Sequence, residues 1–152
     1  MSEHSVSHGT FVVERVFPVP AGRVFAAFAD QEQKRKWFGG PGEDSPVEHF
    51  DFRIGGGESS QGKAPDGNHF TFEATYYDIV PDNRIIYAYE MTMNGRRISV
   101  SVAAIELFPA PNGTRLKVTE HGAFLDGLDA VGPREEGTNF LIDQLGAYLT
   151  AS

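Results

Sequence analysis

The sequence predicts an α+β fold in which a curved antiparallel sheet packs against one long C-terminal helix. Segments rich in β-branched and aromatic residues follow one another with turn residues between them, which is typical of an antiparallel meander. The last part of the chain changes to a helical apolar spacing. Because a curved sheet cannot bury its concave face alone, we expect this helix to cover it and aromatic side chains to line the space between. The 12 Phe and 17 Gly agree with strands, turns and a lined cavity.

Length and charge limit the classes of function. With 152 residues, the chain is expected to hold one domain, residues 10–152, after a flexible polar tail, residues 1–9. The 13 basic and 21 acidic side chains give a net charge of −8, which disfavours nucleic acids and anionic membranes as partners. The basic cluster Lys34-Arg35-Lys36 is expected on a solvated helix face. Cysteine is absent and no segment resembles a secretion signal or a membrane helix, so we expect a cytoplasmic protein.

The first third of the chain predicts one strand and two short helices. Residues 11–17 are rich in β-formers and are followed by a proline, which ends the strand. Pro20 suits the first turn of a helix, and apolar residues at helical spacing extend this helix over 20–29. Asp30 can then cap a second helix over residues 31–38.

The middle of the chain predicts consecutive strands with turn signals between them. These strands cover residues 47–54, 58–63, 70–76, 84–93, 97–108 and 114–121. Asn94-Gly95 is the strongest hairpin signal of the chain. Within 97–108 the apolar alternation changes parity, and a β-bulge near Ala103-Ala104 would reconcile the two halves.

The C-terminal segment predicts one long helix that starts near Pro133. Its first turn carries the charged residues Arg134, Glu135 and Glu136. Its broad apolar stripe consists of Phe140, Leu141, Leu145, Tyr148 and Leu149. This helix is the natural cover for the sheet.

Several short motifs in this order of elements are those of a known family. They are Val13-Glu14-Arg15, Pro20-Ala21, Val24-Phe25-Ala26-Ala27-Phe28, Lys36-Trp37-Phe38-Gly39, Asp51-Phe52-Arg53-Ile54-Gly55-Gly56, Tyr77-Asp78-Ile79-Val80-Pro81, Gly113-Thr114-Arg115-Leu116 and Arg134-Glu135-Glu136-Gly137-Thr138. Over about residues 10–150 the chain resembles the START-like (SRPBCC) superfamily. Within it, the chain is similar to bacterial proteins related to the C-terminal domain of the activator of the heat-shock-protein-90 ATPase.

The resemblance implies a helix-grip fold. In this fold a curved seven-stranded antiparallel sheet wraps around the long C-terminal helix, encloses a cavity, and has two short helices after its first strand. The resemblance implies no universal catalytic residue, because related proteins include lipid carriers, hormone receptors, polyketide cyclases and co-chaperone modules.

Aromatic and sulfur-containing side chains on the apolar strand faces are candidates for lining the cavity. We expect ligand contacts from Phe50, Phe52, Phe70, Phe72, Tyr76, Tyr87, Tyr89 and Met91. Trp37 and Phe38 are expected at the cavity mouth, and Leu141 and Leu145 on the helix side. Glycines near Trp37 predict that residues 37–43 form a mobile rim. The alternative is that these side chains only fill the core.

Glu120 is the best candidate for acid–base chemistry. It shares strand parity with Leu116 and Val118, so alternation points it inward, where burial raises the pKa of an unpaired carboxyl. Alternatively, Glu120 reaches solvent at the strand end or pairs with an arginine. Asp51 and Arg53 are expected to form a structural ion pair. The sequence has no nucleophile elbow, phosphate loop or metal-ligand spacing, so we expect no cofactor and no metal.

The sequence therefore favours a non-catalytic domain that binds a small apolar or amphipathic molecule between the sheet and the C-terminal helix. One alternative is an enzyme of the cyclase, dehydratase or hydrolase type in which Glu120 moves protons. Another is a chaperone-interacting module of a stress response. The sequence leaves both a homodimer and a chaperone contact open.

Overall fold

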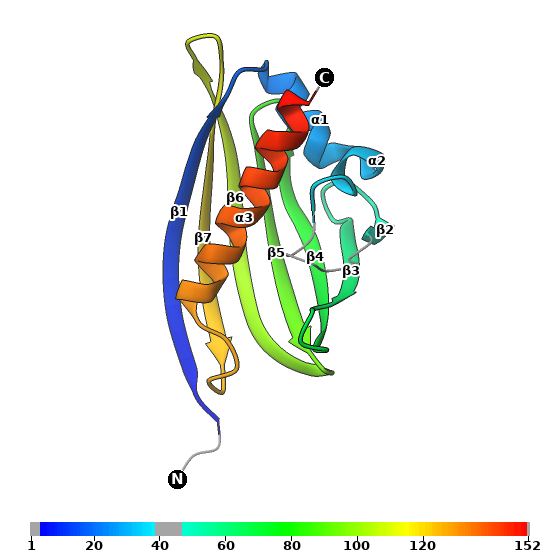
Figure 1. Cartoon of the computed structure of the whole chain (residues 1–152), viewed down its shortest axis with the longest axis vertical. Coiled ribbons are helices and arrows are strands. Elements are labelled where there is room, and N and C mark those ends of the chain that lie inside the picture. The colour runs from blue at the N-terminus through cyan, green and yellow to red at the C-terminus, as the bar shows by residue number, and fades with distance from the viewer. Residues whose placement is uncertain (1–3, 39–46, 152) are drawn as a thin grey trace.

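The computed structural model describes residues 4–38 and 47–151, which form one seven-stranded antiparallel sheet and three helices (Figure 1). The strands lie in the order β1-β7-β6-β5-β4-β3-β2. In chain order the elements are β1 (Val6–Phe17), α1 (Ala21–Ala29), α2 (Gln31–Lys34), β2 (Val47–Phe50), β3 (Gly57–Lys63), β4 (His69–Val80), β5 (Arg84–Met93), β6 (Arg96–Ala110), β7 (Gly113–Leu125) and α3 (Val131–Thr150). The long helix α3 crosses the inner face of the curved sheet (Figure 1). This arrangement confirms the predicted α+β, helix-grip fold.

Strand β1 begins at Val6, so part of the expected N-terminal tail is paired in the sheet. Its register with β7 starts with Val6 opposite Leu125 and continues without interruption to the end of β1. The backbone of Ser5 adds to this contact, because its N–H donates to Asp126 Oδ1 and its carbonyl accepts from the Asp126 N–H. Cross-strand backbone bonds do not require apolar side chains. The polar composition of this segment therefore suggested a tail, although its backbone is paired in the sheet.

Strand β2 ends at Phe50, four residues before the predicted end, because the chain turns there. Gly55 has a φ of 85°, in the left-handed region that favours glycine. Ile54, which alternation placed with the apolar residues of a strand, is 58% exposed. The predicted ion pair is part of the turn, with Arg53 Nε 2.8 Å from Asp51 Oδ2.

The β-bulge of β6 lies at Ile98, so its predicted position near Ala103-Ala104 is wrong. Both pairings of β6 keep a regular register through these alanines, whereas the register with β5 shifts opposite Ile98. A bulge exchanges the residues that face inward and outward, so Val100 and Val102 are exposed. The inward-facing residues beyond the bulge are Ser99, Ser101, Ala103, Ile105 and Leu107. The middle of β6 thus presents small side chains toward α3.

The buried face of α3 completes the hydrophobic core. Thr138, Ile142, Leu145 and Leu149 are its buried side chains, and their spacing places them on one helical face. The three aliphatic members share one core cluster with residues of β1, α1, β6 and β7. These residues include Phe11, Val13, Phe17, Val24, Phe28, Ile105, Leu107, Leu116 and Val118. The C-terminal half of α3 is therefore packed on all inward sides.

Truncation of Leu145 tests this packing. Leu145 is fully buried, so Leu145→Ala should lower the free energy of unfolding by about 2–5 kcal/mol through lost apolar burial and a residual cavity. Its neighbour Gln144 is exposed and supplies the control, since Gln144→Ala should change this free energy by less than about 0.5 kcal/mol. Urea denaturation of both variants and the parent chain measures the difference. Equal stability of the two variants would contradict the core position of Leu145.

Candidate functional site

A pocket of about 200 Å³ lies between the inner face of the sheet and the N-terminal half of α3. Its apolar and aromatic lining residues are Phe28, Trp37, Phe38, Phe70, Phe72, Tyr87, Tyr89, Met91, Ile105, Val118, Leu141 and Ile142. Its polar lining residues are Lys34, Ser60, Gln61, Thr71, Glu120, Arg134 and Thr138. The lining is thus mainly apolar, with a few polar groups at defined places.

Small residues lie on the inner face of β6, in the same cross-strand rows as residues that line the pocket. Ala103 lies between Tyr87 and Glu120 in one cross-strand row, and β6 contributes only Ser101 to the next row. On α3, Gly137 lines the pocket, and a β-carbon added there would meet no neighbouring atom within 4 Å. Large rings on β5 beside small side chains on β6 and α3 leave space that close packing would otherwise fill.

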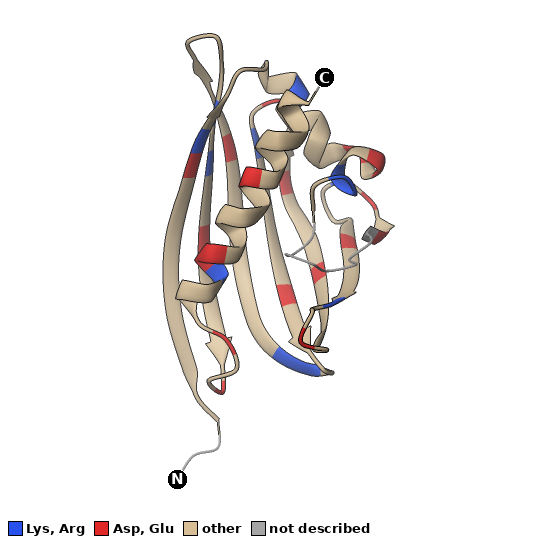
Figure 2. Cartoon of the chain, viewed as in Figure 1, with Lys and Arg blue, Asp and Glu red and all other residues tan. Residues whose placement is uncertain are grey.

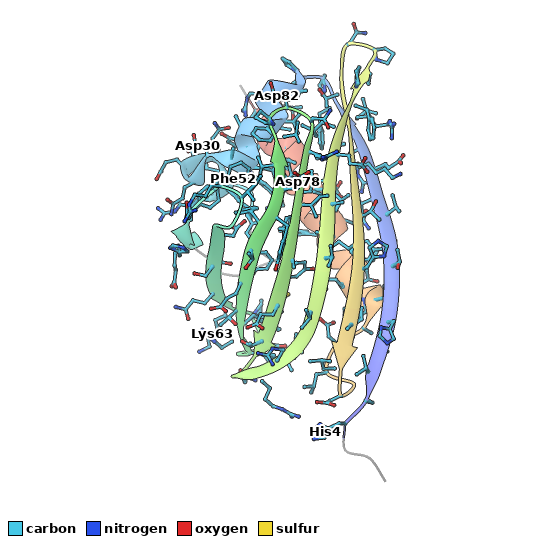
Figure 3. All side chains as sticks on the ribbon, turned by 180° about the vertical axis from the view of Figure 1, so that it is seen from behind. His4, Asp30, Phe52, Lys63, Asp78 and Asp82 are labelled. Atoms are coloured by element: carbon cyan, nitrogen blue, oxygen red, sulfur yellow. The ribbon has the colours of Figure 1, made fainter. Side chains whose placement is uncertain are left out.

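Most of the residues proposed from the sequence as ligand contacts line this pocket. They are Trp37, Phe38, Phe70, Phe72, Tyr87, Tyr89, Met91, Glu120 and Leu141. The residues that lie outside its lining are Phe50, Phe52, Tyr76 and Leu145. Tyr76 and Leu145 are buried in the main core. Phe52 lies at the end of the sheet near α1 and α2 (Figure 3), where its ring contacts Phe25 edge-on with centroids 5.7 Å apart.

Trp37 and Phe38, which follow α2 in the chain, form one wall of the pocket. The Trp37 indole N–H donates to the Ala27 carbonyl at 3.0 Å, which anchors this ring in the core. Phe38 reaches Phe72 of β4, with ring centroids 5.3 Å apart. The predicted mobile rim, residues 37–43, lies outside the described residues from position 39 onward.

Glu120 lies inside the pocket and points inward, as strand alternation predicts. Its side chain is buried, with 5% of the residue exposed. The Tyr89 hydroxyl donates to Glu120 Oε1 at 2.5 Å, and the Thr138 hydroxyl donates to Oε2 at 3.4 Å. Arg134 Nη1 in turn donates to the Tyr89 hydroxyl oxygen at 3.1 Å. Tyr89 therefore stands between the guanidinium of Arg134 and the carboxyl of Glu120.

Burial dominates the protonation chemistry of Glu120. Removal from water raises the pKa of its carboxyl above the ordinary value, because the charged form loses hydration. The hydrogen bonds from Tyr89 and Thr138 and the charge of Arg134 act in the opposite direction without cancelling this effect. Burial and the neighbouring Glu120 also raise the pKa of Tyr89, so its hydroxyl remains a proton donor.

Arg134 is a site residue that the sequence analysis placed only in the first turn of the helix. Its Nη2 donates to Ser99 Oγ at 2.9 Å and forms an ion pair with Asp129. Its guanidinium also lies over two rings, 5.6 Å from the centroid of Tyr89 and 5.4 Å from that of Phe124. The signal that could have found it is spacing: Arg134 precedes the buried Thr138 by four residues and so lies on the same face of α3.

Lys34 contradicts the expectation of a solvated basic cluster. It is 3% exposed and forms a buried ion pair with Glu58 of β3, whereas Arg35 and Lys36 are exposed. The Tyr76 hydroxyl donates to Glu58 Oε1 at 2.5 Å, while Glu58 Oε2 has no hydrogen-bond partner among the described residues. Lys34 is the last residue of α2, and its side chain points toward the sheet, where Glu58 lies. Glu58 and Ser60 both point inward on β3. This alternation is the sequence signal that could have identified Glu58 as the partner of Lys34.

Charges elsewhere on the described chain do not gather into a further site of one sign. Figure 2 shows basic and acidic residues interspersed along the strands and helices. Among residues 4–38 and 47–151, no group of three His, Asp or Glu residues is placed to hold a metal ion. In the same part of the chain, no helix is both long and apolar enough to cross a membrane.

Residues 18–150 match the family described as Activator of Hsp90 ATPase homolog 1-like protein. The chain belongs to this family. The match confirms the resemblance inferred from the sequence motifs. No curated protein matches the chain.

Solved structures of bacterial proteins share the fold of this family member. An uncharacterized protein from Rhizobium leguminosarum is 41% identical, with a TM-score of 0.88 and coverage of 96% of this chain and 97% of that chain. Mll3558 from Rhizobium loti is 44% identical, with a TM-score of 0.85 and coverage of 95% and 99%. CV1439 from Chromobacterium violaceum is 25% identical, with a TM-score of 0.83 and coverage of 94% and 98%. The fold is therefore shared over nearly the whole chain.

Removal of the Lys34 charge should destabilise this family member strongly. Lys34→Met leaves Glu58 charged and buried without its cation, which costs about 3–5 kcal/mol in the free energy of unfolding. Lys36→Met is the matched control, because Lys36 is exposed, and should cost less than about 0.5 kcal/mol. Adding Glu58→Gln to Lys34→Met should recover much of the loss. Chemical denaturation measures all four proteins, and equal effects of the two lysine variants would contradict the buried pair.

The raised pKa of Glu120 makes stability depend on pH in a defined direction. The folded chain holds the Glu120 proton more tightly than the unfolded chain, so Glu120 stabilises the fold at low pH. This contribution is lost as the pH rises from the unfolded pKa, about 4.3, through the raised pKa of the folded state. We therefore expect the unfolding free energy of the parent chain to fall relative to Glu120→Gln across this window. Denaturant titrations of both proteins at a series of pH values measure the difference, and a change in favour of the parent chain would refute the raised pKa.

Proposed function

We propose that this protein binds a small, largely apolar molecule in the pocket beneath α3. The observation that carries the proposal is the lining of that pocket, where aromatic and aliphatic side chains surround a few convergent polar groups. Lining of this kind excludes water from an apolar ligand and fixes the orientation of its polar end.

The pocket volume indicates a ligand of one or two rings. A cavity of roughly 150 Å³ in another protein holds benzene, and this pocket measures about 200 Å³. Each 100 Å² of apolar ligand surface removed from water contributes about 2.5 kcal/mol before the costs of ordering are subtracted. A ligand of this size therefore gains enough from burial to bind without a large polar contribution.

One group of polar side chains in the pocket lies beside the N-terminal half of α3. Glu120, Tyr89, Thr138 and Arg134 form one connected hydrogen-bonded group there. The rings of Phe38 and Phe72 lie against each other at another part of the lining. An amphipathic molecule would place its polar end at Glu120 and its apolar body among the rings.

Proton-transfer catalysis on the bound molecule is a second candidate function, favoured by one observation. Glu120 is a carboxyl with a raised pKa in the lining of an apolar pocket, which is the setting of a general acid or base. Glu120→Gln should then bind a reactive ligand and leave it unchanged, whereas the parent chain converts it. Mass spectrometry of ligand incubated with each protein measures conversion, and equal conversion by both excludes this role.

Filling the pocket from α3 tests the binding proposal. Gly137 lines the pocket with open space in front of it, so Gly137→Leu should occupy that space and weaken binding of naphthylmethanol, a neutral two-ring probe, by about tenfold or more. Gly137→Ala is the control, because it adds one methyl group, should retain binding, and should raise the unfolding free energy by up to about 1 kcal/mol through helix propensity. Titration calorimetry measures both affinities. Unchanged affinity in Gly137→Leu would place the bound probe elsewhere.

A further inference from the structure

We propose that the pocket selects ligands whose polar end is an amine, held as an ammonium ion by the carboxylate of Glu120. The inference rests on the proposed function, because it names the class of molecule that the same pocket binds. It follows from the pairing of charges around the pocket, the unused acceptor sites of Glu120 and the rings beside it.

The cations in the pocket lining already have anionic partners of their own. Lys34 is paired with Glu58, and Arg134 is paired with Asp129. Glu120 makes no ion pair with any described residue. The remaining positions, 1–3, 39–46 and 152, contain no Lys, Arg or His side chain. An ionised Glu120 is thus the one pocket charge that the chain does not neutralise directly.

The hydrogen bonds of Arg134 and Glu120 also favour a ligand with a positively charged end. Arg134 donates to the Tyr89 hydroxyl, to Ser99 Oγ and to Asp129, so three of its five N–H donors already have acceptors, and its guanidinium lies over two rings. Glu120 accepts one short bond from Tyr89 and one long bond of 3.4 Å from Thr138. A carboxylate offers about four acceptor sites, so Glu120 retains capacity for a donor supplied by a ligand.

Aromatic rings beside Glu120 favour a cation as well. Phe72, Tyr87 and Tyr89 all line the pocket, with centroids 4.9 Å apart for Phe72 and Tyr89 and 5.8 Å apart for Tyr87 and Tyr89. In the cross-strand row, only Ala103 separates Tyr87 from Glu120. The negative faces of such rings attract an ammonium group, and the carboxylate supplies the opposite charge that makes its desolvation tolerable.

A ligand carboxylate would meet the opposite situation. It would approach Glu120 and Asp129, and it would share Arg134 with Asp129, which already forms an ion pair with that guanidinium. Like charges at such short range in a water-poor pocket are strongly unfavourable. The structure therefore favours amines over acids of equal size and shape.

Three probes with the same naphthalene ring isomer test the inference: naphthylmethylamine, naphthylmethanol and naphthoate. Near neutral pH they are a cation, a neutral molecule and an anion. Titration calorimetry with the full chain should show the amine binding about tenfold or more tighter than the acid, with the alcohol between them. Equal or tighter binding of the acid would overturn the inference and assign the polar end of the ligand to Arg134.

Matched variants separate the local contact from the net charge of the protein. Glu120→Gln keeps the shape of the side chain and should weaken binding of the amine about tenfold, with less than about threefold change for the alcohol. Glu136→Gln removes one charge from an exposed position of the same helix and should leave both affinities unchanged. If Glu136→Gln weakens the amine as much as Glu120→Gln does, the preference is a long-range charge effect and the inference is wrong.

The outcomes also distinguish this inference from the proposed function. If the alcohol binds, is lost in Gly137→Leu, and the amine has no advantage over it, the pocket binds ligands but the amine preference fails. If none of the three probes binds, both the pocket proposal and the inference fail for molecules of this size. Thermal unfolding of Glu120→Gln confirms that each comparison uses folded protein, and the ranking of the three probes on the parent chain needs no variant.

Discussion

The packing of α3 against the inner face of the sheet is the constraint on which the pocket and its chemistry depend. A seven-stranded sheet has no second layer of its own, so one helix must bury most of that face. The C-terminal half of α3 does so with Leu145 and Leu149 in a closed core. Its N-terminal half instead places Arg134, Gly137 and Thr138 in the lining of the pocket. One helix therefore provides both the stability of the fold and the open space in it.

Two tyrosine–glutamate pairs on the inner face show how similar residues acquire different roles. Tyr76 donates to Glu58 and Tyr89 donates to Glu120, and each pair has a cation nearby. Lys34 contacts Glu58 directly, so that carboxylate joins α2 to the sheet. At the second pair the Tyr89 hydroxyl stands between the cation and Glu120. Glu120 therefore makes no direct ion pair with a described residue, while Glu58 does. Buried pairs of this kind fix geometry more than they add stability.

Membership of the Activator of Hsp90 ATPase homolog 1-like family establishes the fold over residues 18–150. A shared fold does not carry one activity, because function depends on the side chains that the fold brings together. In this chain those side chains come from β3 to β7, the α1–α2 segment and α3, and they converge on one pocket.

Much of this architecture was predictable from sequence because it depends on local patterns. Strand alternation placed Glu120 inward, turn residues separated the strands, and helical spacing identified α3. The same reasoning placed the bulge at Ala103-Ala104 and exposed Lys34, and both were wrong. The bulge at Ile98 depends on the register with β5, and the burial of Lys34 depends on Glu58, which is 24 residues away. Likewise, the interposition of Tyr89 between Arg134 and Glu120 joins three elements distant in the chain. Within a regular stretch of strand or helix, local pattern indicates which face a side chain takes. Its partner across the core is decided only when the strands and α3 pack together, because charge pairing acts through space and not along the sequence.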